Sequence, residues 1–296
     1  MTGEVAVTGL GVPEGPVVHP DTSLTFTEQT RGRVSRCQAG VLSVVAVTGG
    51  APNSHAAGSD GRLYVAQNGG VVGAWRSPDP RAPGIQAIEP DGSVHTVLTA
   101  TGRLPLQAPN DLVFGPDGAL WFTDPAQPFD PADRRPQGRI VRWSGGPAEL
   151  VLDVGPVFCN GLAFQVDGSL VWVESYDRHV CRLGSDGSRT VVAQLPEGHV
   201  PDGLAVAVDG RLFIATCGSH AVTVVGPDGA VEDVLRLDDR AVPTNCAFGP
   251  DGVLWVTDFG VDWETDPAAG RLWRVPTDAV GLAVGTGAVP DRERAP

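Results

Sequence analysis

The sequence contains no lysine, because all 21 of its basic residues are arginine. This absence excludes Schiff-base chemistry, a lysine general base and the lysine of a phosphate-binding P-loop. No long apolar run is present either, so a membrane-spanning helix is not expected. The first segment, MTGEVAVTGL, lacks the basic and apolar regions of a signal peptide, which predicts a cytoplasmic protein.

Positive charge is also scarce, since 35 acidic residues give a formal net charge of −14. This balance argues against a protein that coats nucleic acid or anionic membranes. It is compatible with a hard cation or a small substrate held at one local site. We therefore expect a small-molecule substrate, no nucleic-acid or membrane partner, and a monomer or weak homo-oligomer.

Cysteine is sparse and its spacing carries no metal-binding pattern. The sequence has five cysteines, an odd number, without a CxxC pair, and it has no HExxH motif. We interpret these residues as reduced thiols and expect no structural zinc site. Cys159 is expected to be a core residue rather than a nucleophile.

Glycine and proline, by contrast, are abundant, with 39 and 26 residues respectively. Together with the many valines, threonines and leucines, they favour short strands joined by tight turns. An Asp-led turn, in all but the first case Asp-Gly, precedes an apolar strand at six places along the chain. The signature aspartates are Asp21, Asp60, Asp117, Asp167, Asp209 and Asp251.

Each repeat divides into four strands, as the third one illustrates. Its strands are NDLVF (110–114), ALWFTD (119–124), GRIVRW (138–143) and AELVLDV (148–154). Four antiparallel strands at a period of about 40 to 50 residues are typical of a propeller blade. The sequence therefore predicts an all-β, six-bladed β-propeller that forms a single domain over residues 1–296.

The last repeat has only a weak candidate for a fourth strand, around GLAVG (281–285). The segment EVAVTGL (4–10) stands directly before the first inner strand. We predict that this N-terminal strand completes the last blade and closes the ring, which would remove free sheet edges. The alternative is a disordered N-terminus.

Seven residues before each signature aspartate, five of the six repeats carry a carboxylate or carboxamide. Because these positions start the inner strands, they are predicted to form a ring around the propeller axis. Such a set of oxygen ligands suits Ca²⁺ best, with Mg²⁺, Mn²⁺ or Zn²⁺ as alternatives. The competing interpretation is that each residue caps a turn. The ring positions are Glu14, Asn53, Asn110, Asn160, Asp202 and Thr244.

Three long connections are predicted to lie on the same face as this ring. They span residues 67–84, 125–138 and 259–270. Loops on a rigid scaffold often bind substrates, although each side chain on them has an alternative role in loop packing. The candidate substrate contacts are Trp75, Arg76, Phe129, Arg134, Arg135 and Trp263.

The repeats resemble the senescence-marker-protein/gluconolactonase/luciferin-regenerating family of six-bladed propellers. The resemblance implies a divalent metal, usually calcium, on the axis. It implies Glu14, Asn160 and Asp202 as ligands, with Asn110 as a fourth ligand or a substrate contact. The motifs that carry it are PEGPVVHPD (13–21), PNDLVFGPDGALWFTD (109–124), CNGLAFQVDGSLVWVES (159–175), PDGLAVAVDGRLFIA (201–215) and PTNCAFGPDGVLWVTD (243–258).

The resemblance also implies hydrolysis of a lactone. A metal would polarise the carbonyl, Asp202 would be the general base, and Asn110 and Asn53 would orient the substrate. Two other functions stay open on the same fold. One is a non-hydrolytic enzyme, an isomerase or a bond-forming enzyme of strictosidine-synthase type. The other is a metal-stabilised binding module.

Three further positions bear on the substrate and the chemistry of the site. Ala108 stands where sugar-lactonase members usually carry an arginine, which disfavours a sugar lactone. His55, two residues after Asn53, is expected in the channel as a general acid/base or substrate ligand, or else as a simple hydrogen-bonding residue. His199 is a further candidate substrate contact just before Asp202.

Overall fold

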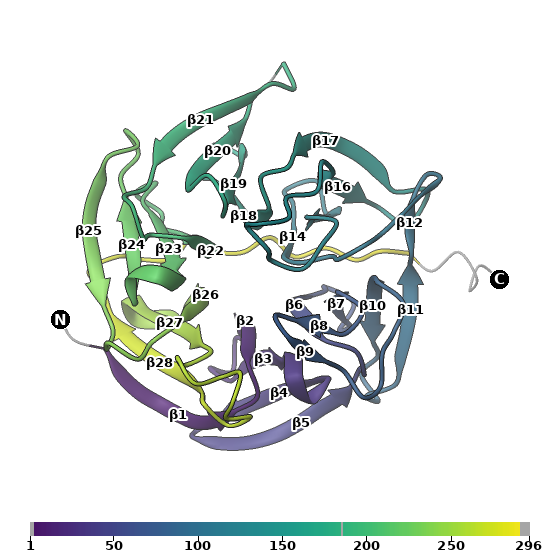
Figure 1. The fold of residues 1–296 in the computed structure, drawn as a ribbon, viewed down its shortest axis with the longest axis horizontal. Coiled ribbons are helices and arrows are strands. Elements are labelled where there is room, and N and C mark those ends of the chain that lie inside the picture. Colours follow the sequence, from purple (N-terminus) through teal and green to yellow (C-terminus); the bar gives the residue numbers. More distant parts are fainter. Residues whose placement is uncertain (1–2, 185, 291–296) are drawn as a thin grey trace.

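The computed structural model describes residues 3–184 and 186–290. Six four-stranded antiparallel sheets surround one centre, as Figure 1 shows. The inner strand of every sheet contacts the inner strands of both neighbours, so the ring is continuous. This arrangement confirms the predicted six-bladed all-β propeller.

Blades 1 to 3 follow one another along the chain, each running from the inner to the outer strand. Blade 1 contains β2 (Pro13–Val18), β3 (Leu24–Glu28), β4 (Arg33–Gln38) and β5 (Val41–Val47). Blade 2 contains β6 (Pro52–Ala57), β7 (Leu63–Gln67), β10 (Gly84–Ile88) and β11 (Val94–Leu98). Blade 3 contains β14 (Leu112–Phe114), β15 (Leu120–Asp124), β16 (Gly138–Trp143) and β17 (Glu149–Gly155).

Blades 4 to 6 complete the ring in the same order. Blade 4 contains β18 (Cys159–Phe164), β19 (Leu170–Glu174), β20 (His179–Leu183) and β21 (Arg189–Gln194). Blade 5 contains β22 (Pro201–Val206), β23 (Leu212–Thr216), β24 (Ala221–Val225) and β25 (Val231–Arg236). Blade 6 contains β26 (Pro243–Phe248), β27 (Val253–Asp258), β28 (Gly270–Pro276) and β1 (Glu4–Leu10).

Short elements join the blades or lie within their connections. They are the hairpins β8 (Val71–Val72) with β9 (Trp75–Arg76) and β12 (Ala100–Thr101) with β13 (Leu104–Pro105), and the 3₁₀ turns η1 (Gln29–Arg31), η2 (Cys217–Ser219) and η3 (Pro250–Gly252). No helix in the described part of the chain is long and apolar enough to cross a membrane.

The N-terminal strand closes the ring as predicted. β1 pairs antiparallel with β28, from Glu4 opposite Arg274 to Leu10 opposite Gly270. Blade 6 thus combines the two ends of the propeller sequence, and the pairing fastens the ring by main-chain hydrogen bonds.

The Asp-Gly turns form because both residues suit a tight reversal. Gly118 has φ 73°, a left-handed conformation that glycine adopts without steric cost. The carboxylate of Asp117 accepts a hydrogen bond from the Ala119 N–H at 3.1 Å. The Asp167 carboxylate accepts the same kind of hydrogen bond from the Ser169 N–H at 3.0 Å. The same turn structure therefore recurs in different blades.

The core consists of apolar layers between neighbouring blades. The layer between blades 2 and 3 includes Tyr64, Phe114 and Phe122, which are fully or almost fully buried. The Tyr64 and Phe114 rings meet edge to face with centroids 5.5 Å apart. Such packing fixes the angle between blades, and so holds the inner strands around the axis.

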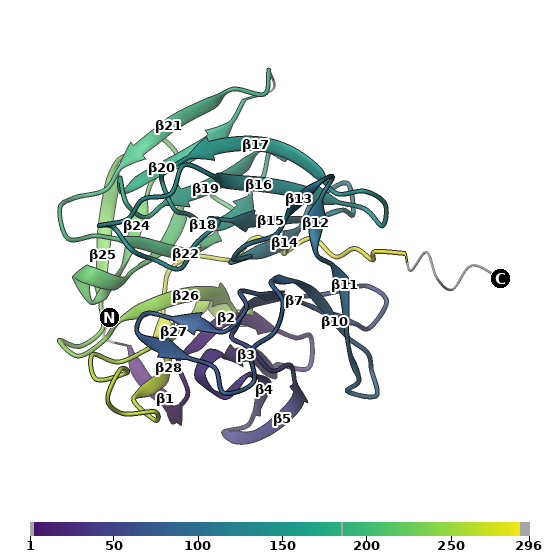
Figure 2. The ribbon, with the colours of Figure 1, turned by 45° about the vertical axis from the view of Figure 1, so that its right-hand side comes forward.

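The segment after β28 does not add a strand to blade 6. Gly281 forms a bridge with Ala207 of blade 5, and Gly285 forms one with Phe114 of blade 3. Val289 then enters the core layer between blades 2 and 3. This segment therefore crosses the face that carries the Asp-Gly turns, behind the ring centre in Figure 1 and across the middle in Figure 2.

Candidate functional site

The inner strands begin with an irregularity that turns adjacent side chains toward the axis. The pairing of β2 with β3 skips between Glu14 and Val17, and the pairing of β22 with β23 skips between Pro201 and Leu204. A bulge of this kind re-aims side chains at the end of a strand. The residue after a ring position can therefore also face the channel.

Side chains from three blades meet across the axis. The Asn245 amide of blade 6 donates to Glu14 Oε2 of blade 1 at 3.0 Å and to Asp111 Oδ2 of blade 3 at 3.2 Å. All three residues are buried, with exposed fractions of 2 to 7%. Glu14, a predicted ring position, thus meets two residues, Asp111 and Asn245, that each follow a predicted ring position in the chain.

Asp202 lies beside the same group, on blade 5. The Cys217 thiol donates to Asp202 Oδ2 at 3.3 Å, and an Asn160 hydrogen bond also reaches the Asp202 carboxylate. Asn160 Nδ2 in turn donates to Ser175 Oγ at 3.1 Å, and that hydroxyl donates to the Pro201 carbonyl at 2.7 Å. These contacts orient Asn160 and Asp202 relative to each other.

The axial carboxylates, Glu14, Asp111 and Asp202, repel one another in a buried space. Burial raises the pKa of Glu14 well above its usual value, and the Asp202 and Asp111 charges raise it further. Burial also raises the pKa of Asp111. The pKa of Asp202 rises to about 7 through burial and the Asp111 charge, against the lowering effect of hydrogen bonds from Cys217 and Asn160.

This electrostatic pattern suits a hard divalent cation. Among the described residues, the charges that act on the three carboxylates are other carboxylates. Buried charges of one sign are unfavourable unless a counter-charge or proton joins them. Carboxylate and amide oxygens are the ligands that Ca²⁺ prefers, so the donor set fits the metal expected from the sequence.

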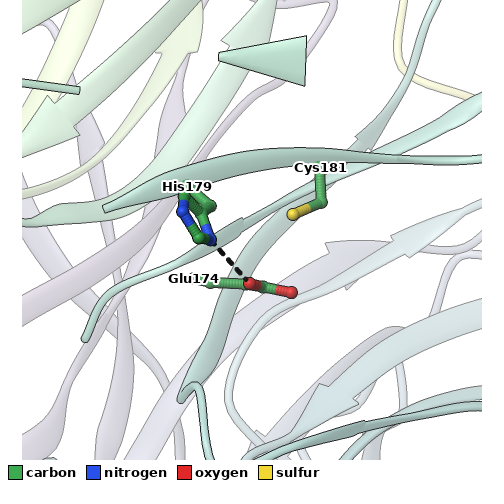
Figure 3. Close-up of side chains that lie close together, drawn as sticks. All are labelled: Glu174, His179 and Cys181. Carbon is green, nitrogen blue, oxygen red and sulfur yellow. Dashed lines mark ion pairs between the residues drawn. The ribbon is translucent and has the colours of Figure 1, made fainter. Parts of the chain in front are cut away.

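A compact group of side chains that could bind a metal lies in blade 4, but an arginine already pairs with its carboxylate. Glu174, His179 and Cys181 form the one such group in the described residues with ligand atoms within 4.8 Å of one another (Figure 3). Arg189 Nε donates to Glu174 Oε1 at 2.6 Å and Trp172 Nε1 donates to it at 3.0 Å. This group is therefore a structural ion pair.

One ring position, Thr244, behaves differently from the expectation. Thr244 does not join the axial group, because its hydroxyl donates to the Pro13 carbonyl at 3.1 Å and lies 3.0 Å from Thr257 Oγ1. The register shift after Pro243 turns the next residue, Asn245, toward the axis instead. Asn53 is half-buried, and its carbonyl accepts a hydrogen bond from Thr27.

Asp111 and Asn245 are functional candidates that the spacing rule misses. The sequence does hold a signal for them, because the residue after each ring position is glycine in three repeats and polar in the other three. A Cβ on Gly203 would lie 2.0 Å from the Asn245 side chain. The glycines thus leave room at the axis for the polar side chains of the other blades.

His55 of blade 2 is buried against blade 1 in the neutral form. Its Nε2 lies 2.6 Å from Thr25 Oγ1, which also lies 2.8 Å from His19 Nε2. Burial lowers the pKa of His55 to about 3. A neutral imidazole suits a hydrogen-bonding role and not that of a general acid at neutral pH.

The other predicted contacts fall into three places. Asn110 is buried and precedes the axial residue Asp111 in the chain. Trp75 and Trp263 pack with Val72 in one partly buried cluster over blades 1, 2 and 6. His199 points into blade 5, where Nδ1 lies 2.9 Å from Thr223 Oγ1, so the structure does not bring it to the axial carboxylates.

The remaining loop arginines already have partners. Arg76 donates to the carbonyls of Gly73 and Trp75 at 2.7 and 2.9 Å. Arg135 Nε lies 3.9 Å from Asp133. Cys159 is fully buried, as expected of a core residue.

Comparison with known proteins extends this description. A solved gluconolactonase from Xanthomonas campestris is 24% identical with a TM-score of 0.74, and the match covers 92% of this chain and 88% of the other. A calcium-binding protein from Agrobacterium tumefaciens, regucalcin, is 19% identical with a TM-score of 0.77, and the match covers 97% of each chain. A luciferin-regenerating enzyme matches with 18% identity and a TM-score of 0.76, covering 97% and 99%.

At these identities the structural comparison establishes the shared fold. A search of curated proteins finds no match. The model of the SMP-30/gluconolactonase/LRE-like region matches residues 12–260, which is most of the chain. The protein therefore belongs to the SMP-30/gluconolactonase/LRE-like family.

Proposed function

We propose that this protein is a divalent-metal-dependent hydrolase of lactones. The observation that carries the proposal is the group of three axial carboxylates, buried without a positively charged partner in the described residues. Membership of a family that includes gluconolactonases supports the reaction class.

In this proposal, Glu14, Asn160 and Asp202 hold the metal, with Asn110 as a fourth ligand or a substrate contact. Ca²⁺ is the expected ion, since the donors are oxygens of mixed charge. When bound, a divalent cation supplies Lewis-acid polarisation of a carbonyl and stabilises negative charge on its oxygen. Asn245 is a positioning residue that donates to the Glu14 carboxylate, and Asp111 holds the Asn245 amide in place.

Asp202 is the proposed general base. Its carboxylate is oriented by the Cys217 thiol at Oδ2 and by Asn160. A bound cation would lower its pKa, so that the carboxylate is ionised at neutral pH and accepts a proton from water. Asn110 and the neutral imidazole of His55 are available to orient the substrate by hydrogen bonds.

A chelation experiment tests the proposal. Protein dialysed against EDTA is assayed with a panel of lactones, before and after addition of CaCl₂, and its melting temperature is measured in both states. We expect activity to be lost and regained with the ion. We also expect stabilisation of about 2.7 kcal/mol when free Ca²⁺ is 100 times its dissociation constant.

The Asp202→Asn variant tests the proposed base. It should fold, but its kcat should fall about 10²–10⁴-fold if Asp202 is the base. Full turnover by this variant, or lactone hydrolysis that survives chelation, would contradict the proposal. The same assay separates it from the non-hydrolytic enzyme and the binding module, neither of which would open a lactone.

A further inference from the structure

Three aromatic rings form a shelf next to the proposed metal ligand Asn160. The aromatic shelf consists of Phe129, Phe158 and Tyr176. Phe129 lies 5.2 Å from each of the other two ring centroids, and Phe158 and Tyr176 lie 5.4 Å apart. The three rings therefore form one mutual cluster, contributed by the 125–138 connection and blade 4.

The shelf is joined to the axial site through the main chain. Phe158 precedes Asn160 by two residues and stands directly before β18, with φ 50°. The Ser175 N–H donates to the Phe158 carbonyl at 3.0 Å, and the Ser175 hydroxyl accepts from Asn160 at 3.1 Å. The shelf thus stands just outside the axial site, on the face where the inner strands begin.

The outermost ring of the shelf faces solvent. Phe158 and Tyr176 are 5% and 8% exposed, whereas Phe129 is 47% exposed. In the described parts of the chain, Phe129 is the one aromatic side chain among the exposed large apolar residues. An exposed apolar surface beside a polar site often marks a ligand contact.

The polar groups around the shelf already have partners. The Gln127 side-chain amide donates to the Tyr176 hydroxyl at 2.9 Å, and its carbonyl oxygen accepts from the Arg135 N–H at 2.6 Å. Arg134 pairs with Asp177 at 2.8 Å and covers the Tyr176 ring, 4.9 Å from its centroid. The polar groups that touch the Tyr176 ring and hydroxyl are therefore already bonded within the protein.

From this geometry we infer that the site prefers lactones that carry an apolar alkyl or aryl substituent, which lies on Phe129 while the ring carbonyl lies at the axis. The inference rests on the proposed lactonase function and names its substrate class. A substrate covered with hydroxyl groups would lose hydrogen bonds to water on this shelf without replacement. An alkyl chain loses none, and gains by burial.

A chain-length series tests the inference. kcat/KM is measured with γ-lactones from γ-butyrolactone to γ-undecalactone, and with glucono-δ-lactone. We expect kcat/KM to rise about two- to fourfold for each methylene that reaches the shelf, from about 0.8 kcal/mol per buried CH₂. Glucono-δ-lactone should be a poorer substrate than the long-chain lactones.

Variants locate the effect. Phe129→Ala should remove most of the chain-length dependence of kcat/KM, and Phe129→Leu should restore part of it. Val166→Ala, which alters an exposed apolar residue in the Asp167 turn on the opposite face, should leave the series unchanged. Melting temperatures verify that each variant is folded.

Binding gives a second readout that does not need turnover. Calorimetry with γ-lactams of matching alkyl length should show dissociation constants that fall with chain length, and this trend should disappear in Phe129→Ala. A flat series in the wild-type protein, or an unchanged slope in Phe129→Ala, would overturn the substrate class. If the lactones are hydrolysed in a chelator-sensitive way but without any dependence on chain length, the substrate class is wrong and the proposed lactonase function stands. If no lactone is hydrolysed, the proposed lactonase function itself is wrong.

Discussion

The propeller contains two kinds of buried carboxylate, and their partners differ. Four carboxylates at the ends of the second strands are fully buried, and each has an arginine within salt-bridge distance. We call Glu28, Asp124, Glu174 and Asp258 the blade-edge carboxylates. The axial carboxylates meet one another and amide groups instead.

The contrast explains which carboxylates maintain the fold and which are available for chemistry. Burial alone raises the pKa of Glu28, but hydrogen bonds from Ser35, Gly11 and Arg33, with the Arg31 charge, make its net shift downward. The pKa of Glu14 shifts upward, since burial and two neighbouring carboxylates act in the same direction. A carboxylate with an arginine of its own chain needs no further ion, whereas the axial group is balanced by a proton or an external cation.

The largest effect is expected at a blade-edge position. Asp124→Asn would leave Arg139, which is 3% exposed and pairs with Asp124 at 2.8 Å, as a buried charge without its partner. Breaking a buried pair in this way costs about 3–5 kcal/mol. Urea denaturation should show this loss with or without Ca²⁺, and an unchanged midpoint would mean that the pair is dispensable.

The matching axial substitution should act in the opposite sense. Asp202→Asn removes one of three mutually repelling charges, so the metal-free variant should be at least as stable as the wild type. It should also lose most of the stabilisation by Ca²⁺, which is about 2.7 kcal/mol at 100 times the dissociation constant. A metal-free Asp202→Asn that unfolds as readily as Asp124→Asn would remove the distinction between the two groups.

The smallest effect concerns pH, and it sharpens the same comparison. Because the folded pKa of Asp202 is raised to about 7, mainly by burial, the folded chain holds this proton more tightly than the unfolded chain. Its contribution to stability is therefore present at low pH and is lost as the pH rises from about 4 to about 7.

Urea midpoints of EDTA-treated protein at pH 5.5 and pH 8 measure this contribution. Buried histidines such as His55, whose lowered pKa arises from burial, act in the opposite direction, so wild type is compared with Asp202→Asn. The wild type should lose more stability, or gain less, than the variant between the two pH values. Identical changes in both proteins would show that Asp202 titrates normally.

The sequence alone was enough to predict the blade count, and it indicated Glu14 and Asp202 but not Asp111 or Asn245. The Asp-Gly turn and the alternation of strand side chains are local signals, so they repeat wherever a blade repeats. Glu14, Asn160 and Asp202 stand at one phase of that repeat, and the structure places Glu14 and Asp202 close enough to raise the pKa of Glu14. Closure by β1 followed from the missing outer strand of blade 6.

The contacts of the loop residue His199 and of the segment after β28 were beyond this reasoning. His199 shares its face with Asp202, yet its side chain turns to Thr223, because local sequence does not set which of two nearby partners a loop residue contacts. The path of residues 281–285 across the turn face likewise depends on free main-chain groups at Ala207 and Phe114.

Periodicity determined that oxygen-bearing side chains would surround an axis, since equal positions in equal blades must meet at the centre of a closed ring. The tertiary structure decided that Asn245 replaces Thr244 there, because a one-residue register shift sends the adjacent side chain to the opposite side of the strand. It also decided which carboxylates receive an arginine, because those pairs form between strands whose register the sequence does not state.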